Sequence, residues 1–140
     1  MSRRTAKKKT LFTVPLAPGE APALRGGRCS CGHVFFPPQQ MGCDVCGASG
    51  DAIAIVDLTA AGVLQTFATA HRQTRPDGGA PLIVGAVALD DGPVVEVVLD
   101  TEDESGLRVG QRVAGRLVEV GEDDDGRAVV DCFFTPFGAT

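Results

Sequence analysis

The distribution of apolar residues along the chain predicts a protein made mainly of β-strands. From residue 53 onward, short runs rich in valine and isoleucine alternate with turn signals that contain glycine, proline and aspartate. The predicted strands are Ile53 to Leu58, Gly62 to His71, Leu82 to Leu89, Val94 to Leu99, Gln111 to Val120 and Ala128 to Phe134. The spacing of an amphipathic helix is nearly absent. Five or six strands of this length predict a small Greek-key barrel.

Two of these runs carry further predictions. In the fifth run, Val113, Leu117 and Val120 alternate with charged residues, and Gly115 interrupts the alternation, which predicts a bulge there. The run Leu82 to Leu89 is almost wholly apolar. Such a strand is either buried on both faces or offers one face to another protein, and we expect a second protein there.

Four cysteines lie close together, in the segments Cys29-Ser30-Cys31-Gly32 and Cys43-Asp44-Val45-Cys46-Gly47. Each pair ends in Cys-Gly, which is typical of a zinc knuckle because glycine relieves the crowding of the turn. A tetrahedral zinc ion needs four soft ligands from two directions, and two knuckles supply them without a large core. The spacing therefore predicts a structural zinc site formed by Cys29, Cys31, Cys43 and Cys46.

The first cysteine pair encloses one residue where the ordinary knuckle encloses two. If Cys29 cannot reach the metal, His33, Asp44 or a water molecule would complete the shell. The alternative to metal is that the thiols stay reduced or form disulfides. Because the N-terminus is polar and basic, with no apolar signal segment, we expect a reducing cytoplasm, which favours metal over disulfides.

Charge is distributed unevenly along the chain. The first ten residues contain Arg3, Arg4 and all three lysines, whereas the remainder has eight arginines against eighteen acidic residues. We expect the head to be a disordered tail rather than a binding arm, followed by a proline- and glycine-rich extended lead-in over residues 11–28. No window approaches eighteen uninterrupted apolar residues, so we expect no membrane-spanning helix.

Several segments together resemble a known family. They are Leu24 to Pro38, Cys43 to Gly47, Leu58 to Phe67, Pro81 to Leu89, Leu107 to Val113 and Phe134 to Pro136. The pattern resembles the zinc-ribbon and OB-fold family long called domain of unknown function 35. This resemblance implies a rubredoxin-like zinc ribbon followed by a five- to six-stranded OB-fold barrel. The expected parts are a basic tail and lead-in over residues 1–23, the ribbon over 24–50 and the OB-fold domain over 51–137.

The resemblance also implies a function. Members of the family associate in hetero-oligomers with thiolase-superfamily proteins, including retro-aldolases, and the OB fold helps to form the site for a coenzyme A thioester. We therefore expect a non-catalytic accessory subunit of a thiolase-type or retro-aldolase-type complex that acts on acyl-CoA. The acyl chain and the pathway, whether lipid or aromatic degradation, stay open. Two features depart from the family pattern, namely the shortened first knuckle and the proline-rich lead-in where many members have helix.

The residues themselves disfavour catalysis and nucleic-acid binding. His33 and His71 are the only histidines, and Cys132, the one cysteine outside the ribbon, lies in an apolar run where an inert thiol is expected. Nucleic-acid binding by an OB fold requires a basic groove and aromatic platforms, but the body is acidic and has no Trp or Tyr. We treat a single-stranded nucleic-acid-binding protein as the third interpretation, after a free-standing acyl-CoA-binding module.

Candidate ligand residues follow from the chemistry of coenzyme A. His71, Arg72 and Arg75 stand where a predicted strand enters a glycine-rich loop, so their cationic groups could meet the nucleotide phosphates. Arg25 and Arg28, beside the ribbon, form a second candidate patch. The ribbon is expected to place Phe35, Phe36, Pro37 and Pro38 against the partner. The acidic stretches 100–105 and 122–125 are expected to be solvated turns.

Overall fold

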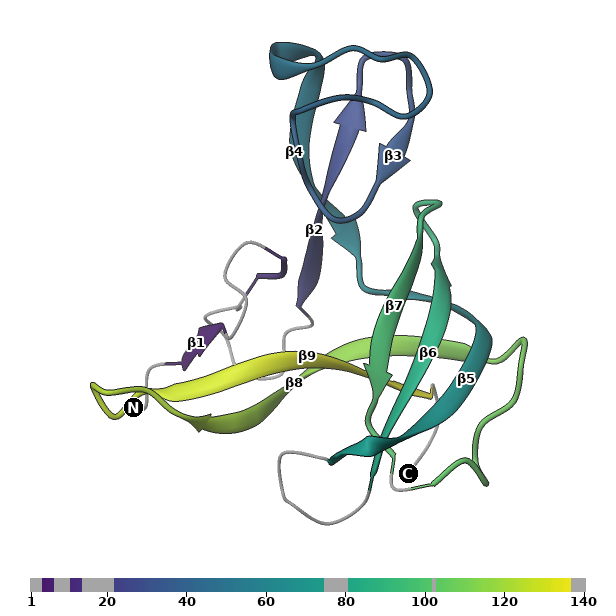
Figure 1. Ribbon diagram of the computed structural model, residues 1–140, viewed down its shortest axis with the longest axis vertical. Helices are drawn as coiled ribbons and strands as arrows, with labels where there is room; N and C mark the ends of the chain where they lie inside the picture. The colour runs from purple at the N-terminus through teal and green to yellow at the C-terminus, as the bar shows by residue number, and fades with distance from the viewer. Residues whose placement is uncertain (1–3, 7–10, 14–21, 75–80, 102, 137–140) are drawn as a thin grey trace.

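The computed structural model describes residues 4–6, 11–13, 22–74, 81–101 and 103–136 (Figure 1). Their regular structure is mainly strand, with one short 3-10 helix, Gly50–Ala52. The strands are β1 (Arg4–Ala6), β2 (Ala23–Cys29), β3 (Val34–Phe35), β4 (Ile53–Thr59), β5 (Ala61–Thr74), β6 (Pro81–Leu89), β7 (Val94–Leu99), β8 (Arg112–Glu122) and β9 (Ala128–Pro136). They form a three-stranded sheet in the order β3-β2-β4 and a six-stranded sheet in the order β1-β9-β7-β6-β5-β8.

Strands β5 to β9 close into a five-stranded barrel. β5, β6 and β7 form an antiparallel meander, and β8 pairs antiparallel with both β5 and β9. The barrel closes where β7 meets β9 in parallel, through the pair Leu99 and Phe134. This is the Greek-key order of an OB fold. The predicted fold class is confirmed, with five strands in the barrel; the first of the six predicted strands, β4, belongs to the smaller sheet.

All six predicted strands are present, and each end lies within three residues of its predicted position. The burial of β6 distinguishes between the two alternatives predicted for its apolar run. Alternate residues such as Ile83 and Val87 are buried in the barrel, whereas the outward residues between them are only partly buried. Strand β6 is therefore not buried on both faces, and its outward apolar residues lie at the surface of the barrel.

The bulge predicted at Gly115 is wrong. Gly115 pairs regularly with Phe134, and the irregularity in the β8–β9 ladder lies between Glu119 and Gly121. The lack of a side chain at Gly115 has a packing reason instead. A Cβ atom there would lie 3.0 Å from the Cβ of Ala60 and 3.0 Å from the Sγ of Cys132.

Two described stretches that the sequence placed in the lead-in and the tail form paired strands. Within the lead-in, β2 pairs with β4 along the whole strand, from Ala23 opposite Thr59 to Cys29 opposite Ile53. In the tail, β1 pairs in parallel with Ala128–Val130 on the free edge of β9, where disorder was expected. Because both pairings join residues far apart in the sequence, local composition did not reveal them. The ribbon sheet runs across the expected boundary at residue 50, and that boundary stays a prediction.

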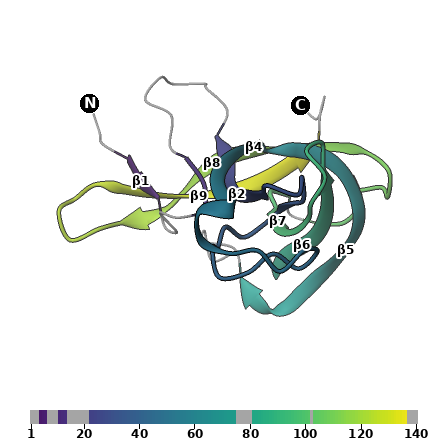
Figure 2. The same cartoon turned by 90° about the horizontal axis from the view of Figure 1, so that it is seen from above.

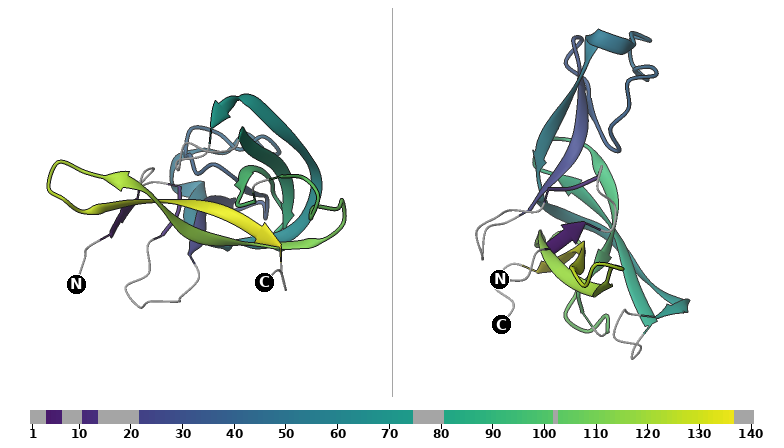
Figure 3. Two further views of the ribbon diagram at one scale, coloured as in Figure 1. Left: turned by 90° about the horizontal axis from the view of Figure 1, so that it is seen from below. Right: turned by 90° about the vertical axis from the view of Figure 1, so that its left-hand side faces the viewer.

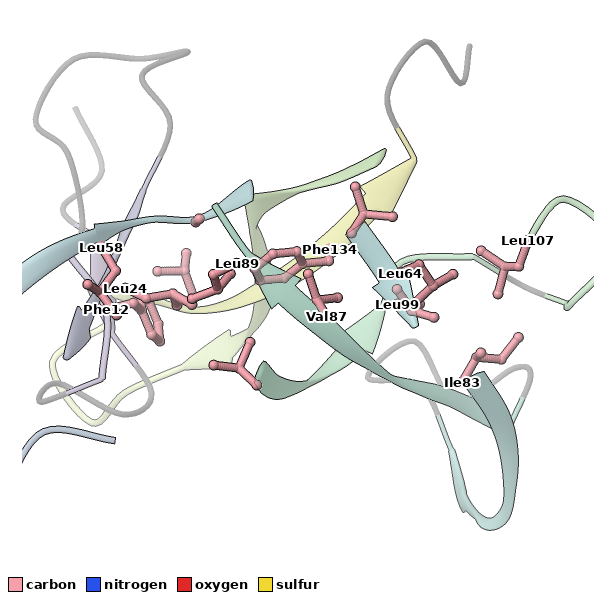
Figure 4. Packing of buried hydrophobic residues seen from close by; sticks show 14 residues of the cluster. Phe12, Leu24, Leu58, Leu64, Ile83, Val87, Leu89, Leu99, Leu107 and Phe134 are labelled. Atoms are coloured by element: carbon pink, nitrogen blue, oxygen red, sulfur yellow. The ribbon is translucent and has the colours of Figure 1, made fainter. Parts of the chain in front are cut away.

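One hydrophobic core joins the base of the ribbon to the barrel. Figure 4 shows Phe12, Leu24 and Leu58 at one end of a row of buried side chains that continues to Val87, Leu99 and Phe134. A second, much smaller cluster contains Cys29, Cys43 and Ile53, with Phe35 and Ala48 packed against it. The upper ribbon therefore has little apolar packing of its own.

The ribbon stands above one end of the barrel, and the β8–β9 hairpin extends sideways beyond it (Figures 1 and 3). Seen from above, the ribbon strands overlie the barrel rather than the hairpin (Figure 2). Across the described ranges, no helix is long and apolar enough to cross a membrane.

Candidate functional site

The four ribbon cysteines converge at one point. The Sγ atoms of Cys29, Cys31, Cys43 and Cys46 all lie within 4.8 Å of one another. Cys29 and Cys46 are 3.4 Å apart and Cys31 and Cys43 are 3.8 Å apart, measured between sulfur atoms, and all are free thiols. Four sulfurs at about 2.3 Å from a tetrahedral zinc ion stand about 3.8 Å from each other. The spacing of these thiols therefore fits a zinc ion.

Two glycine turns aim the thiols at this point. The N–H of Gly32 donates to the carbonyl of Cys29 at 2.8 Å, and the N–H of Gly47 donates to the carbonyl of Cys43 at 2.8 Å. Both glycines have a positive φ, +97° and +78°, which other residues rarely adopt. The backbone N–H of Val45 also donates to the Sγ of Cys43 at 3.4 Å. The single residue inside the first pair thus does not prevent Cys29 from reaching the cluster.

The electrostatics favour thiolate on the buried cysteines. The backbone N–H of Cys31, aided by the Cys46 thiol, lowers the pKa of Cys29 to about 7. The backbone N–H of Cys46 lowers the pKa of Cys43 in the same way. At Cys46 the N–H of Ala48 acts in the same direction, but the neighbouring thiols Cys29 and Cys31 outweigh it and raise the pKa to about 12. Four thiols this close cannot all ionise without a cation between them.

The substitute ligands considered above lie outside the cluster. No further His, Asp or Glu joins the cysteine group within the described part of the chain. The ring of His33 stacks on Phe35, with ring centroids 5.7 Å apart, and Asp44 is exposed.

The predicted partner-contact segment begins in the ribbon strand β3 and continues to Phe36, which packs against the main core. Phe35 is partly buried over Gly27, where a Cβ atom would overlap the phenyl ring. Pro37 is exposed and Pro38 is partly buried. Both phenylalanines therefore have packing roles inside this chain, and their contact with a partner stays a prediction.

The candidate coenzyme A residues lie in two separate places. Arg25 and Arg28 are exposed on β2 of the ribbon. His71 is exposed near the end of β5, which Figure 1 places at the opposite end of the barrel. The side chain of Arg72 and all of Arg75, with the glycine-rich loop, lie outside the described residues. The described candidates are thus not brought together by this chain alone.

The remaining thiol, Cys132, is partly buried on β9. Burial, with a smaller effect of the Asp131 carboxylate, raises its pKa to about 12. A thiol with such a pKa is almost wholly protonated near neutral pH and is a weak nucleophile.

Described residues of both acidic stretches form turns, as expected. The Asp123 carboxylate accepts hydrogen bonds from the N–H groups of Asp125 and Arg127, at 3.0 and 2.8 Å, and pairs with the guanidinium of Arg127. The carboxylate of Asp103 accepts a hydrogen bond from the N–H of Ser105 at 3.0 Å.

Sequence reasoning missed one cavity of about 130 Å³, at the seam between β7 and β9. Because these strands share a single residue pair, the seam is open, and Phe12, Leu24 and Phe36 cover it. The apolar pair Leu11-Phe12 in an otherwise proline-rich segment was the available signal.

Comparison with known proteins agrees with this architecture. Residues 52–118, from the end of the 3-10 helix into β8, match the family described as ChsH2, C-terminal OB-fold domain. Among solved structures, the chain is similar to one described as Ltp2-ChsH2(DUF35) aldolase. The TM-score is 0.61 with 23% identity, over 81% of this chain and 84% of that chain, a likeness that establishes the fold. No match was found among curated proteins. The match over residues 52–118 and the structural likeness together support the resemblance to the family of domain of unknown function 35 that the sequence indicated.

Proposed function

We propose that this chain is a non-catalytic accessory subunit of an aldolase-type complex that acts on acyl-CoA thioesters. The observation that supports this most directly is the structural likeness to a chain of the Ltp2-ChsH2(DUF35) aldolase, which extends over about four-fifths of both chains. The partner, an enzyme subunit of the thiolase superfamily, would carry out the carbon–carbon chemistry.

The described residues are consistent with a subunit that does not itself catalyse a reaction. Cys132 is held as a protonated thiol by burial. His71 is exposed on a strand, and no ion pair joins it to another described residue. Nucleophilic catalysis requires a nucleophile beside a positioned base, and these two groups do not form such a pair in the described structure.

The four ribbon thiols are proposed to hold a structural zinc ion. Cys29, Cys31, Cys43 and Cys46 match the soft ligand set and the spacing that zinc requires. Zinc held by four thiolates has no open position for water, so its contribution would be folding free energy for the ribbon.

The acyl-CoA site is proposed to be shared with the partner. Coenzyme A carries several phosphate charges, and Arg25 and Arg28 offer two exposed cations on one ribbon strand. A site built only from this chain is disfavoured because the body is acidic and its described cationic candidates are separated.

The test is affinity purification of the tagged chain from its native cells, followed by identification of the proteins that accompany it. The account expects a stoichiometric aldolase-type or thiolase-fold enzyme. Calorimetry with an acyl-CoA should then show binding to the complex and much weaker binding to the isolated chain. Tight binding by the isolated chain would favour the free-standing acyl-CoA module, and co-purified nucleic acid would contradict both interpretations.

A further inference from the structure

The outward face of β5, β6 and β7 is apolar where a solvent-facing sheet is normally polar. We define the apolar face by six partly or fully exposed apolar residues at its centre, Ala68, Val84, Ala86, Ala88, Val94 and Val98. Strand pairing places Ala68, Val84 and Val98 in one row, and Ala88 beside Val94 in another. An antiparallel sheet that faces water on one side carries mostly polar residues there, so this composition requires an explanation.

One row across this face is polar at its ends. Thr66 pairs with Ala86, which pairs with Glu96, so the hydroxyl and the carboxylate flank an alanine. Glu96 is exposed, and no ion pair joins it to another described residue. The described side chains on this face include no Lys or Arg, and Glu96 gives the face a negative charge.

The centre of the face is hollowed. A depression of about 410 Å³ on this face is lined by residues that include Ala68, Gly85, Ala86 and Val94. Val94 is 57% exposed, a high value for a strand valine. Small residues on β5 and β6 create the depression, so a protruding apolar side chain of another molecule would fit into it.

The charge of the face distinguishes among its candidate occupants. A second copy docked through the same face would bring two Glu96 carboxylates together, with no cation among the described side chains of the face to pair with them, which is costly. An anionic ligand such as a nucleotide would meet the same carboxylate, with no cation among the described side chains of the face to offset the repulsion. A protein surface with an apolar ridge and one Lys or Arg fits this face best, because the ridge would fill the depression and the cation would pair with the Glu96 carboxylate.

We infer that the apolar face docks the enzyme subunit of the complex, through an apolar ridge that fills the hollow and a basic side chain that pairs with Glu96. This inference rests on the proposed function for the identity of the occupant. It differs from the predicted contact through Phe35 to Pro38, because the face lies on the barrel and not on the ribbon.

The experiment compares three variants of the full chain in binding to the co-purified enzyme subunit. Glu96→Arg reverses the charge, and Ala86→Arg places a long cation over the hollow. Val109→Arg is the matched control, because Val109 is an apolar residue, 67% exposed, in the segment between β7 and β8 and outside the apolar face. Thermal unfolding of each variant establishes that it folds.

The expected result is that Glu96→Arg and Ala86→Arg each weaken binding by about tenfold or more, whereas Val109→Arg stays within about twofold of the wild type. Replacement of the partner's basic residue by Glu should restore binding to Glu96→Arg. If both face variants bind like the control, the inference is wrong and the proposed function stands. If the wild-type chain captures no enzyme subunit, the proposed function fails and the inference fails with it. A homodimer that Ala86→Arg dissociates would also overturn it, because the occupant would be a second copy.

Discussion

At the residue scale, Gly62 shows how closely the barrel strands pack. A Cβ atom added at Gly62 would overlap the carbonyl oxygen of Ala88 on the neighbouring strand β6, and backbone cannot move as easily as a side chain. Gly62→Ala should therefore lower the free energy of unfolding by about 1–3 kcal/mol. The control is Gly42→Ala, because nothing lies within 4 Å of a Cβ atom there. Denaturant unfolding measures both, and equal stability of the two variants would contradict the packing described.

A second residue-scale prediction concerns Asp123 and pH. The backbone N–H of Arg127, together with that of Asp125, lowers the pKa of the Asp123 carboxyl below its usual value of about 3.9. A carboxyl whose pKa is lower in the folded state stabilises the fold above its unfolded pKa and loses that effect as the pH falls through the folded pKa. Asp123→Asn should therefore lower the melting temperature at pH 7, and the difference from the wild type should shrink in acid.

The matched control for this prediction is Asp124→Asn, in the same turn. The Asp124 side chain is exposed and makes no hydrogen bond to another described residue. Melting temperatures measured between about pH 7 and pH 2 distinguish the two variants. If the melting temperature of Asp123→Asn lies below that of the wild type by the same amount at every pH, the carboxylate charge is not the cause of the difference.

At the element scale, the upper ribbon depends on its metal. Its own buried cluster contains only Cys29, Cys43 and Ile53, whereas Leu24 and Leu58 at its base belong to the barrel core. Removal of zinc by a chelator should therefore speed amide hydrogen exchange over residues 29–48 and leave β5 to β9 protected.

Two variants control this prediction. Cys43→Ser should show the fast exchange without any chelator, and Cys132→Ser should retain both zinc and ribbon protection, because Cys132 lies outside the cysteine cluster. Loss of protection in the barrel at the same chelator concentration would show that ribbon and barrel unfold together.

The elements also show what sequence can predict. β4 to β9 were predictable because each run is locally rich in valine or isoleucine and ends at a turn signal. β2 was not, since Gly26 and Gly27 weaken its strand signal, and the reason for these glycines lies in distant residues, Leu58 and Phe35, that pack against them. The β1 pairing likewise depends on an edge of β9 more than a hundred residues away.

The candidate site likewise has features that the sequence predicts and features that it does not. The cysteine cluster was predictable because ligand spacing within two short turns nearly determines its geometry. The separation of His71 from Arg25 and Arg28 was not, because it depends on the direction of β5 across the barrel. The apolar β6 run suggested a partner surface, but Glu96, which gives that surface its charge, joins it only through strand pairing.

At the scale of the whole molecule, the ribbon and barrel share one core and leave the apolar face of β5, β6 and β7 uncovered. The central claim is that this chain works as a zinc-containing accessory subunit bound to an enzyme. The most direct measurement is native mass spectrometry of the tagged chain isolated from its own cells, since the mass reports both metal and partner. The account predicts a hetero-oligomer in which each copy of the 14.5 kDa chain carries one zinc ion beside an aldolase-type subunit. A free, metal-less chain at that mass would contradict it.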